Sequence, residues 1–283
     1  FRLAGMARVR PAREAGHSAA AVRQRRFPEC PMKRISSLAA ALVLALGLCG
    51  TASAAPLVVA HDTNFKPFEF KDESGKYTGF DIELWDALAK RAGLEYKFQP
   101  MDFNGIIPGL QTGNIDAAVA AMTISPQRLE VVDMSDPYYD TGIMIAVRAE
   151  DADKVKSLDD LAGKVIATKT GTSSADYIRT KFAGKAGEVK LFPNNDNMYL
   201  ELLSGGADGV FFDESVVRDF ARASEGKIVE VGPLYEGQSY GVGFPKGSKI
   251  VGPINEALKA MKADGSYKAL YVKWFGSEPA AKQ

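Results

Sequence analysis

Seven residues that could bind a small charged molecule are spread along the chain. Each follows a predicted strand or begins a predicted helix, which is where open α/β folds place their ligands. A guanidinium can hold a carboxylate, an aspartate can accept from an ammonium group, and aromatic rings can enclose an aliphatic stem. The set therefore suits a small zwitterion. Its members are Asp62, Phe65, Phe103, Thr123, Arg128, Lys169 and Asp213.

Alternating strands and helices must position these residues. A strand is predicted over 57–60, and Asp81 is expected to cap a helix that ends at Gly93. Such alternation predicts an α/β fold with parallel sheets covered by helices. Further strands are expected over 96–99, 117–120, 165–168, 189–192 and 209–212, and helices over 105–111, 157–162, 174–182, 197–204, 214–224, 250–263 and 267–275.

The alternation restarts after Ser157, which predicts two lobes. Two extended segments, 138–142 and 236–240, are expected to cross between them as a two-stranded hinge. We therefore predict two open sheets flanked by helices, with the ligand in the cleft that the hinge spans. Lobe 1 is expected to comprise 55–137 plus 241–283, and lobe 2 to comprise 143–235.

Residues 32–54 have the pattern of a secretory signal peptide. Met32-Lys33-Arg34 is a basic start, 38–48 is an apolar run too short to span a bilayer, and Ala52-Ser53-Ala54 is a small-x-small site. We expect cleavage near Ala54/Ala55. Residues 1–31 are expected to be a non-native or misannotated extension. Lipid attachment at Cys49 is disfavoured because Leu48 precedes it where a small residue is needed.

The mature chain, 55–283, lacks cysteine because Cys30 and Cys49 both precede the cleavage site, so neither disulfides nor thiolate chemistry is expected. It holds 26 basic and 33 acidic side chains, a formal charge of −7. This charge argues against nucleic acid and anionic membrane surfaces as partners. No apolar stretch of 18 residues follows the signal, so no membrane insertion of the mature chain is expected. His61 is its only histidine and no metal-ligand spacing occurs, so we predict no metal and no cofactor.

Several short strings resemble the polar amino-acid-binding family of periplasmic solute-binding proteins, solute-binding protein family 3, and within it the glutamine binders. The string Phe-x-Pro-Phe-x-Phe followed by Gly-Phe-Asp is specific to that family, and the similarity spans 55–279. The family implies a two-lobed Venus-flytrap fold that binds one amino acid in the periplasm. It also implies a monomer that presents its ligand to the membrane permease of an ABC importer. The strings lie at 61–70, 101–108, 138–139, 241–247 and 273–276.

The resemblance implies a role for each candidate residue. Arg128 would grip the α-carboxylate through two parallel hydrogen bonds, and Asp213 would accept from the α-ammonium. Without the resemblance, Arg128 would be a solvated surface charge and Asp213 a helix cap for the helix that starts at Glu214. The backbone of the strand-to-helix turn over 169–173 would meet the same carboxylate. The implied ligand-binding set is Asp62, Phe65, Phe103, Ala121, Thr123, Arg128, Lys169, Thr172, Ser173 and Asp213.

Specificity for glutamine would rest on Asp62 and Lys169, which the glutamine binders aim at the side-chain amide. A carboxylate and an ammonium group that face one polar group select a neutral group that both donates and accepts. Surface ion pairing is the alternative for these two residues. The chain departs from the glutamine binders at Phe212, where they have histidine, and at Ala121 and Ser173, where they have glycine. Phe212 leaves asparagine, glutamate and other polar amino acids open as ligands.

Two other classes of function remain possible at this point. Some proteins with this fold are reported to be dehydratases, but the only plausible acid–base pair in the mature chain is His61 beside Asp62, so we predict that the protein is not an enzyme. A sensor lobe would bind an amino acid and signal to a receptor. Such lobes are usually fused to a membrane span, which the mature chain does not show, so a free carrier is favoured.

Overall fold

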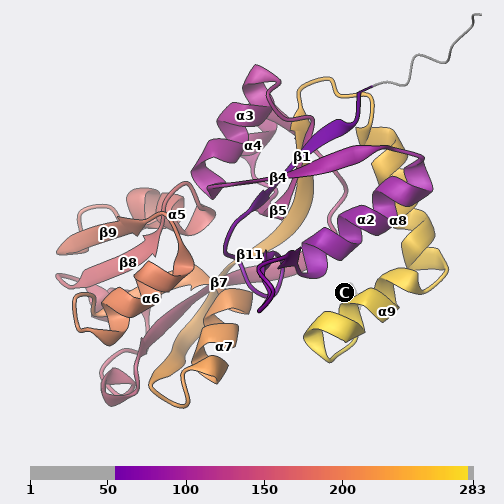
Figure 1. The fold of residues 1–283 in the computed structure, drawn as a ribbon. Coiled ribbons are helices and arrows are strands. Elements are labelled where there is room, and N and C mark those ends of the chain that lie inside the picture. Colours follow the sequence, from indigo (N-terminus) through magenta and orange to yellow (C-terminus); the bar gives the residue numbers. More distant parts are fainter. Residues whose placement is uncertain (1–54, 280–283) are drawn as a thin grey trace, which may run out of the picture. The chain divides into compact units, whose positions relative to one another are not determined.

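Two long strands run through the middle of the fold in the computed structural model, which describes residues 55–279 (Figure 1). β7 (Tyr139–Arg148) and β11 (Ile228–Pro245) pair with each other in antiparallel fashion. Strands on either side extend the pair into one mixed sheet of nine strands in the described chain. The predicted extension 1–31 and signal peptide 32–54 lie outside the described residues.

One group of elements contains both chain segments assigned above to lobe 1. β5 lies between β1, its parallel neighbour, and β11, its antiparallel neighbour, while β6 pairs with the end of β11. The strands are β1 (Leu57–Asp62), β4 (Tyr96–Met101), β5 (Ala117–Thr123) and β6 (Val132–Met134), with a small hairpin of β2 (Phe70–Lys71) and β3 (Tyr77–Thr78). The helices are α2 (Phe80–Ala92), η1 (Phe103–Gly105), α3 (Ile106–Thr112), α4 (Pro126–Val131), α8 (Val251–Ala263) and α9 (Ser266–Phe275).

The second group of elements extends the sheet beyond β7. β10 pairs with β7 in antiparallel fashion, and β8 lies between β10 and β9 as a parallel strand. The strands are β8 (Val165–Lys169), β9 (Glu188–Phe192) and β10 (Gly209–Asp213). The helices are η2 (Ala149–Asp151), η3 (Leu158–Leu161), α5 (Ser173–Lys181), α6 (Asn195–Leu203) and α7 (Glu214–Ala223).

The predicted strands and helices are confirmed, with small shifts at their ends. The two predicted sheets are joined into one mixed sheet, because β11 pairs in antiparallel fashion with β5 of the first group and β7 with β10 of the second. In the predicted hinge, Thr141 pairs with Gln238 and Tyr139 with Tyr240, so the two extended segments lie side by side. The boundaries of the lobes and of the hinge stay predictions.

Small apolar residues explain the centre of the first group. All seven residues of β5, with the sequence AAVAAMT, are buried. A strand with both faces covered is expected to be continuously apolar. Ala117, Val119 and Ala121 pack in the cluster that contains α2 and α8, while Ala118, Ala120 and Met122 pack with α3. This packing on both faces of β5 fixes the position of its carboxyl end at Thr123.

The prediction for Asp81 is wrong. Helix α2 begins at Phe80 after Gly79, without a side-chain cap, and Asp81 is fully buried inside its first turn. The carboxylate of Asp81 instead accepts hydrogen bonds from the Ala121 N–H and the Tyr138 hydroxyl, both at 2.7 Å. The predicted end of this helix is confirmed, because Gly93 adopts the left-handed conformation with φ 66°.

Among residues 55–279, no helix is both long enough and apolar enough to span a bilayer.

Candidate functional site

A buried ion pair joins the carboxyl ends of two strands. Asp62 ends β1 and Lys169 ends β8, and the Lys169 ammonium group donates to the Asp62 carboxylate. Both side chains are only 1% exposed. The Thr63 N–H also donates to Asp62 at 2.7 Å. Burial raises the pKa of Asp62, and the charge of Lys169 opposes this rise. Asp62 and Lys169 therefore bind each other directly in the interior, and the alternative of a surface ion pair is wrong.

The two predicted aromatic walls lie against the two predicted cations. The Arg128 guanidinium carbon lies 5.3 Å from the centre of the Phe103 ring, and the Lys169 Nζ lies 5.9 Å from the same ring. The Lys169 Nζ also lies 5.5 Å from the centre of the Phe65 ring. These separations fall within the range of cation–π attraction. Phe103 thus lies close to both cations, and Phe65 lies close to Lys169.

Arg128 occupies the first turn of α4, as predicted. Pro126 begins this helix, and the Ser125 hydroxyl caps it by accepting from the Arg128 N–H at 3.3 Å. The guanidinium donates to the Thr123 carbonyl at 2.9 Å and to the Gly171 carbonyl at 3.2 Å. Arg128 therefore reaches from the end of β5 to the turn between β8 and α5. Burial lowers its pKa, which the carboxylates of Asp213 and Asp176 oppose.

The hydroxyl groups of two predicted site residues converge on a residue of β11. The Thr123 and Ser173 hydroxyls each donate to the Gln238 Oε1 at 3.0 Å, and they lie 3.3 Å from each other. Thr123 ends β5 and Ser173 begins α5. Gln238 belongs to the predicted hinge, so one carboxamide oxygen links both groups of elements.

Asp213 is held by two hydroxyl groups at the end of β10. Its carboxylate accepts from the Tyr240 hydroxyl at 2.5 Å and from the Ser174 hydroxyl at 3.1 Å, and the residue is 4% exposed. Burial raises its pKa, while these hydrogen bonds and the charges of Arg128 and Lys169 oppose the rise. No side-chain bond caps α7, so the capping alternative is wrong.

The remaining predicted residues contribute in less direct ways. The Thr172 hydroxyl caps α5 by accepting from the Ala175 N–H at 3.3 Å and donates to the Lys169 carbonyl at 2.8 Å, so its side chain is already engaged. Ala121 has a left-handed φ of 44°. Phe212 is fully buried, and its ring centre lies 5.7 Å from that of Phe65. Where the glutamine binders have histidine, Phe212 thus places an apolar ring next to the Phe65 ring.

A cleft of about 670 Å³ opens beside this cluster. It is bordered by α4, α5 and the predicted hinge, and Thr123, Arg128 and Ser173 line it. The other predicted site residues do not line this cleft, although contacts through Lys169, Phe103 and Arg128 connect Asp62 to it. The structure thus brings the predicted residues into one connected cluster.

Sequence reasoning missed four residues that complete the cluster. Gln238 holds Thr123 and Ser173, and Tyr240 and Ser174 hold Asp213. The Asn64 side chain, after β1, donates to Asp196 of α6 in the other group of elements at 2.8 Å. Polar side chains inside the predicted hinge and next to the 169–173 turn were the available signal for Gln238 and Ser174.

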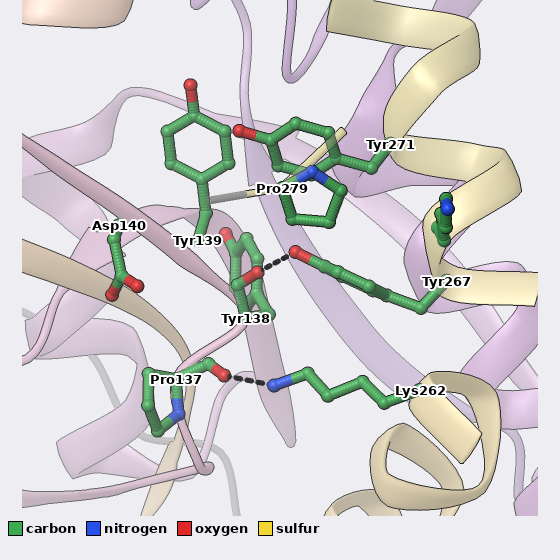
Figure 2. A pocket seen from close by; sticks show the side chains of 9 residues that line it. Pro137, Tyr138, Tyr139, Asp140, Lys262, Tyr267, Tyr271 and Pro279 are labelled. Carbon is green, nitrogen blue, oxygen red and sulfur yellow. Dashed lines mark hydrogen bonds between the residues drawn. The ribbon is translucent and has the colours of Figure 1, made fainter. Parts of the chain in front are cut away.

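A second cavity, of about 320 Å³, lies apart from these residues (Figure 2). Tyr138, Tyr139, Tyr267 and Tyr271 contribute to its lining, and Lys262 donates to the Pro137 carbonyl at 2.8 Å on its border. Within the described part of the chain, no group of three or more His, Asp or Glu side chains is placed to hold a metal ion.

Comparison with known proteins places the chain in a family. Residues 57–277 match the model of the bacterial extracellular solute-binding proteins, family 3. The chain belongs to this family. Its two groups of elements are therefore the two lobes of the periplasmic binding protein fold, as predicted.

Relatives with several ligands resemble this chain. The L-cystine-binding protein TcyJ of Escherichia coli K12 is 30% identical over 78% of this chain and 83% of its own length. The glutamine-binding protein GlnH of Bacillus subtilis is 35% identical over 79% of this chain and 82% of its own length. An ancestral arginine-binding protein, solved with glutamine and with arginine, is 42% identical with a TM-score of 0.74, over 79% of this chain and 99% of its own.

Proposed function

We propose that this protein captures a free polar amino acid, with L-glutamine as the preferred ligand, and presents it to the membrane permease of an ABC importer. Family membership supports amino-acid binding, because the relatives reported above are named for cystine, glutamine and arginine. We further infer that the protein is exported to the periplasm, acts as a monomer and is not an enzyme. The lobe boundaries given above belong to the same proposal.

The charge balance of the buried cluster is the observation that carries the choice of ligand. Asp62 and Lys169 neutralise each other at 1% exposure. Arg128 and Asp213 then remain as one cation and one anion, which match the carboxylate and the ammonium of a zwitterion. A ligand with a charged side chain would leave a net charge in a dry site, which is costly. A neutral polar side chain that both donates and accepts fits Asp62 and Lys169 together.

The hydroxyl cluster supports the binding of an oxygen acceptor next to Arg128. Thr123 and Ser173 already donate to one oxygen, the Gln238 Oε1. A ligand carboxylate oxygen would compete for the same donors and would add the charge-assisted bonds of Arg128. Since Thr123 and Ser173 belong to different lobes, a ligand held by both stabilises the closed form by differential contact.

Replacement of Asp62 by asparagine is expected to reduce the preference for glutamine over glutamate. A carboxylate about 4 Å from Asp62 costs about 4 kcal/mol at an effective dielectric of 20, and this cost disappears in the variant. Lys169 would also be left free to attract a ligand carboxylate. Titration calorimetry with both amino acids measures the change. Asp159→Asn, at a side chain that is 76% exposed, is the control; unchanged discrimination in Asp62→Asn would contradict the assignment.

A thermal-shift panel of the twenty amino acids and cystine tests the proposed ligand class. Glutamine is expected to give the largest rise in melting temperature, because it leaves the buried site neutral. A larger shift with arginine, glutamate, asparagine or cystine would replace glutamine but keep the class. No shift with any amino acid, together with turnover of a prephenate-like substrate, would instead establish a dehydratase.

A further inference from the structure

Two carboxyl side chains lie together in the interior of lobe 1 without enough donors for both. Glu69 and Asp81 are each 0% exposed, and their backbones are adjacent because the Asp81 N–H donates to the carbonyl of Phe68, the residue before Glu69, at 2.9 Å. Among the described residues, nothing donates to either oxygen of Glu69 or to the Oδ1 of Asp81. Two adjacent buried carboxylates cannot both stay ionised, so the pair must share a proton.

The surroundings decide which residue carries this proton. The Asp81 Oδ2 accepts from the Ala121 N–H and from the Tyr138 hydroxyl, each at 2.7 Å, and accepting two donors favours the ionised form. Glu69 has no such donor. Its hydroxyl, if protonated, can donate to the otherwise unpartnered Oδ1 of Asp81. Burial raises the pKa of both groups, and for Glu69 the nearby charge of Asp81 adds to the rise.

Two more charged groups act on Glu69 from neighbouring elements. The carboxylate of Asp62, at the end of β1, favours the protonated form, whereas the ammonium of Lys169, at the end of β8, opposes it. These two charges form the buried pair described above and act on Glu69 in opposite directions, and both rank below burial and Asp81. The shared proton therefore depends chiefly on burial and on Asp81.

Asp81 fastens two parts of the site through its hydrogen bonds. Ala121 holds a left-handed φ of 44°, which is costly for a residue other than glycine, and lies two residues before Thr123. Tyr138 directly precedes β7, and its carbonyl accepts from the Tyr267 hydroxyl of α9 (Figure 2). Asp81 thus ties the end of β5 to the start of a predicted hinge strand.

We propose that Glu69 is a positioning residue that donates one shared proton to Asp81 and thereby holds Ala121 and Tyr138 in the geometry that amino-acid binding requires. The effect on binding rests on the proposed function, whereas the shared proton does not. Glutamine at position 69 keeps a donor to Asp81 without a titratable group. Leucine at position 69 removes both the donor and the titratable group.

The test compares the purified wild type with Glu69→Gln, Glu69→Leu and the exposed control Glu73→Gln. A raised pKa in the folded state means that stability falls as the pH rises above the pKa of the unfolded glutamate, about 4.3. Above that pH the unfolding equilibrium constant of the wild type is therefore expected to rise relative to that of Glu69→Gln, by up to about tenfold per pH unit. Glu73→Gln is expected to follow the wild type.

Infrared difference spectroscopy of the wild type at neutral pH tests for the shared proton without requiring any variant to fold. A deuterium-sensitive band of a protonated carboxyl group is expected, and its absence would overturn the proposal. The proposal would also be overturned if the unfolding equilibrium constants of the wild type and Glu69→Gln changed with pH in the same way.

At pH 7, Glu69→Gln is expected to bind glutamine nearly as well as the wild type, and Glu69→Leu about tenfold more weakly. Equal binding by Glu69→Leu and the wild type would refute the positioning role. If the wild type binds no amino acid while the band and the pH difference persist, only the proposed function fails.

Discussion

Replacement of Arg128 by alanine is expected to abolish binding of every amino acid that the protein recognises. The guanidinium would hold the α-carboxylate, which all free amino acids share, so the loss does not depend on the side chain of the ligand. Two charge-assisted hydrogen bonds of about 1.5–3 kcal/mol each correspond to a loss of affinity of about 100-fold to 10 000-fold. Titration calorimetry with glutamine and with the next best ligand of the panel measures this loss.

Two variants separate this effect from a general change in charge. Arg128→Lys keeps the positive charge but loses the planar fork, so intermediate affinity is expected. Arg222→Ala removes an arginine whose side chain is 77% exposed on α7 and should leave affinity unchanged. The fold should tolerate Arg128→Ala, because the hydrogen bond to the Gly171 carbonyl is exposed and that to the Thr123 carbonyl is only partly buried, so water can replace the guanidinium. Normal binding by Arg128→Ala would refute the carboxylate assignment.

Replacement of Lys169 by methionine is expected to cause the largest loss of stability. Asp62 would remain at 1% exposure without its partner, and breaking a buried ion pair costs about 3–5 kcal/mol. The pKa of Asp62, already raised by burial, would rise further without Lys169. The destabilisation should therefore be largest at high pH and shrink as the pH falls and Asp62 takes up a proton. Urea unfolding of the wild type and the variant at several pH values measures both effects.

The double variant Asp62→Asn/Lys169→Met distinguishes an unpaired charge from lost packing. It removes both charges and is expected to recover a large part of the stability that Lys169→Met loses. Lys185→Met breaks an exposed pair with Asp159 and should cost only about 0–1 kcal/mol. If Lys169→Met were as stable as Lys185→Met, Asp62 and Lys169 would not be a buried ion pair shielded from water.

Local patterns were sufficient to predict most helices and the parallel strands, whereas β7 and β11 were predicted only in part, as the extended segments 138–142 and 236–240. Strand β5 is recognisable as a run of small apolar residues, and Gly93 marks the end of α2 by its tolerance of a left-handed conformation. The convergence of Arg128, Lys169 and Phe103 could also be predicted, because each lies at a strand end or helix start and the family resemblance assigns their roles.

The hydrogen-bond partners of buried polar groups could not be predicted in the same way. An aspartate at a helix start suits a cap, but Asp81 and Asp213 are drawn instead to hydroxyl and N–H donors far away in the sequence. Gln238 is one polar residue among several in an extended segment. Its role appears only when β11 brings it to Thr123 and Ser173. These choices depend on tertiary packing, which decides the donors that reach each buried acceptor.

A crystal structure of the protein with glutamine tests the central claim most directly. One glutamine is expected between the lobes, with its α-carboxylate on the Arg128 guanidinium and its α-ammonium on the Asp213 carboxylate. Its side-chain amide should lie next to Asp62 and Lys169. A glutamine bound elsewhere, or bound in this cleft with its carboxylate away from Arg128 and its ammonium away from Asp213, would contradict the account.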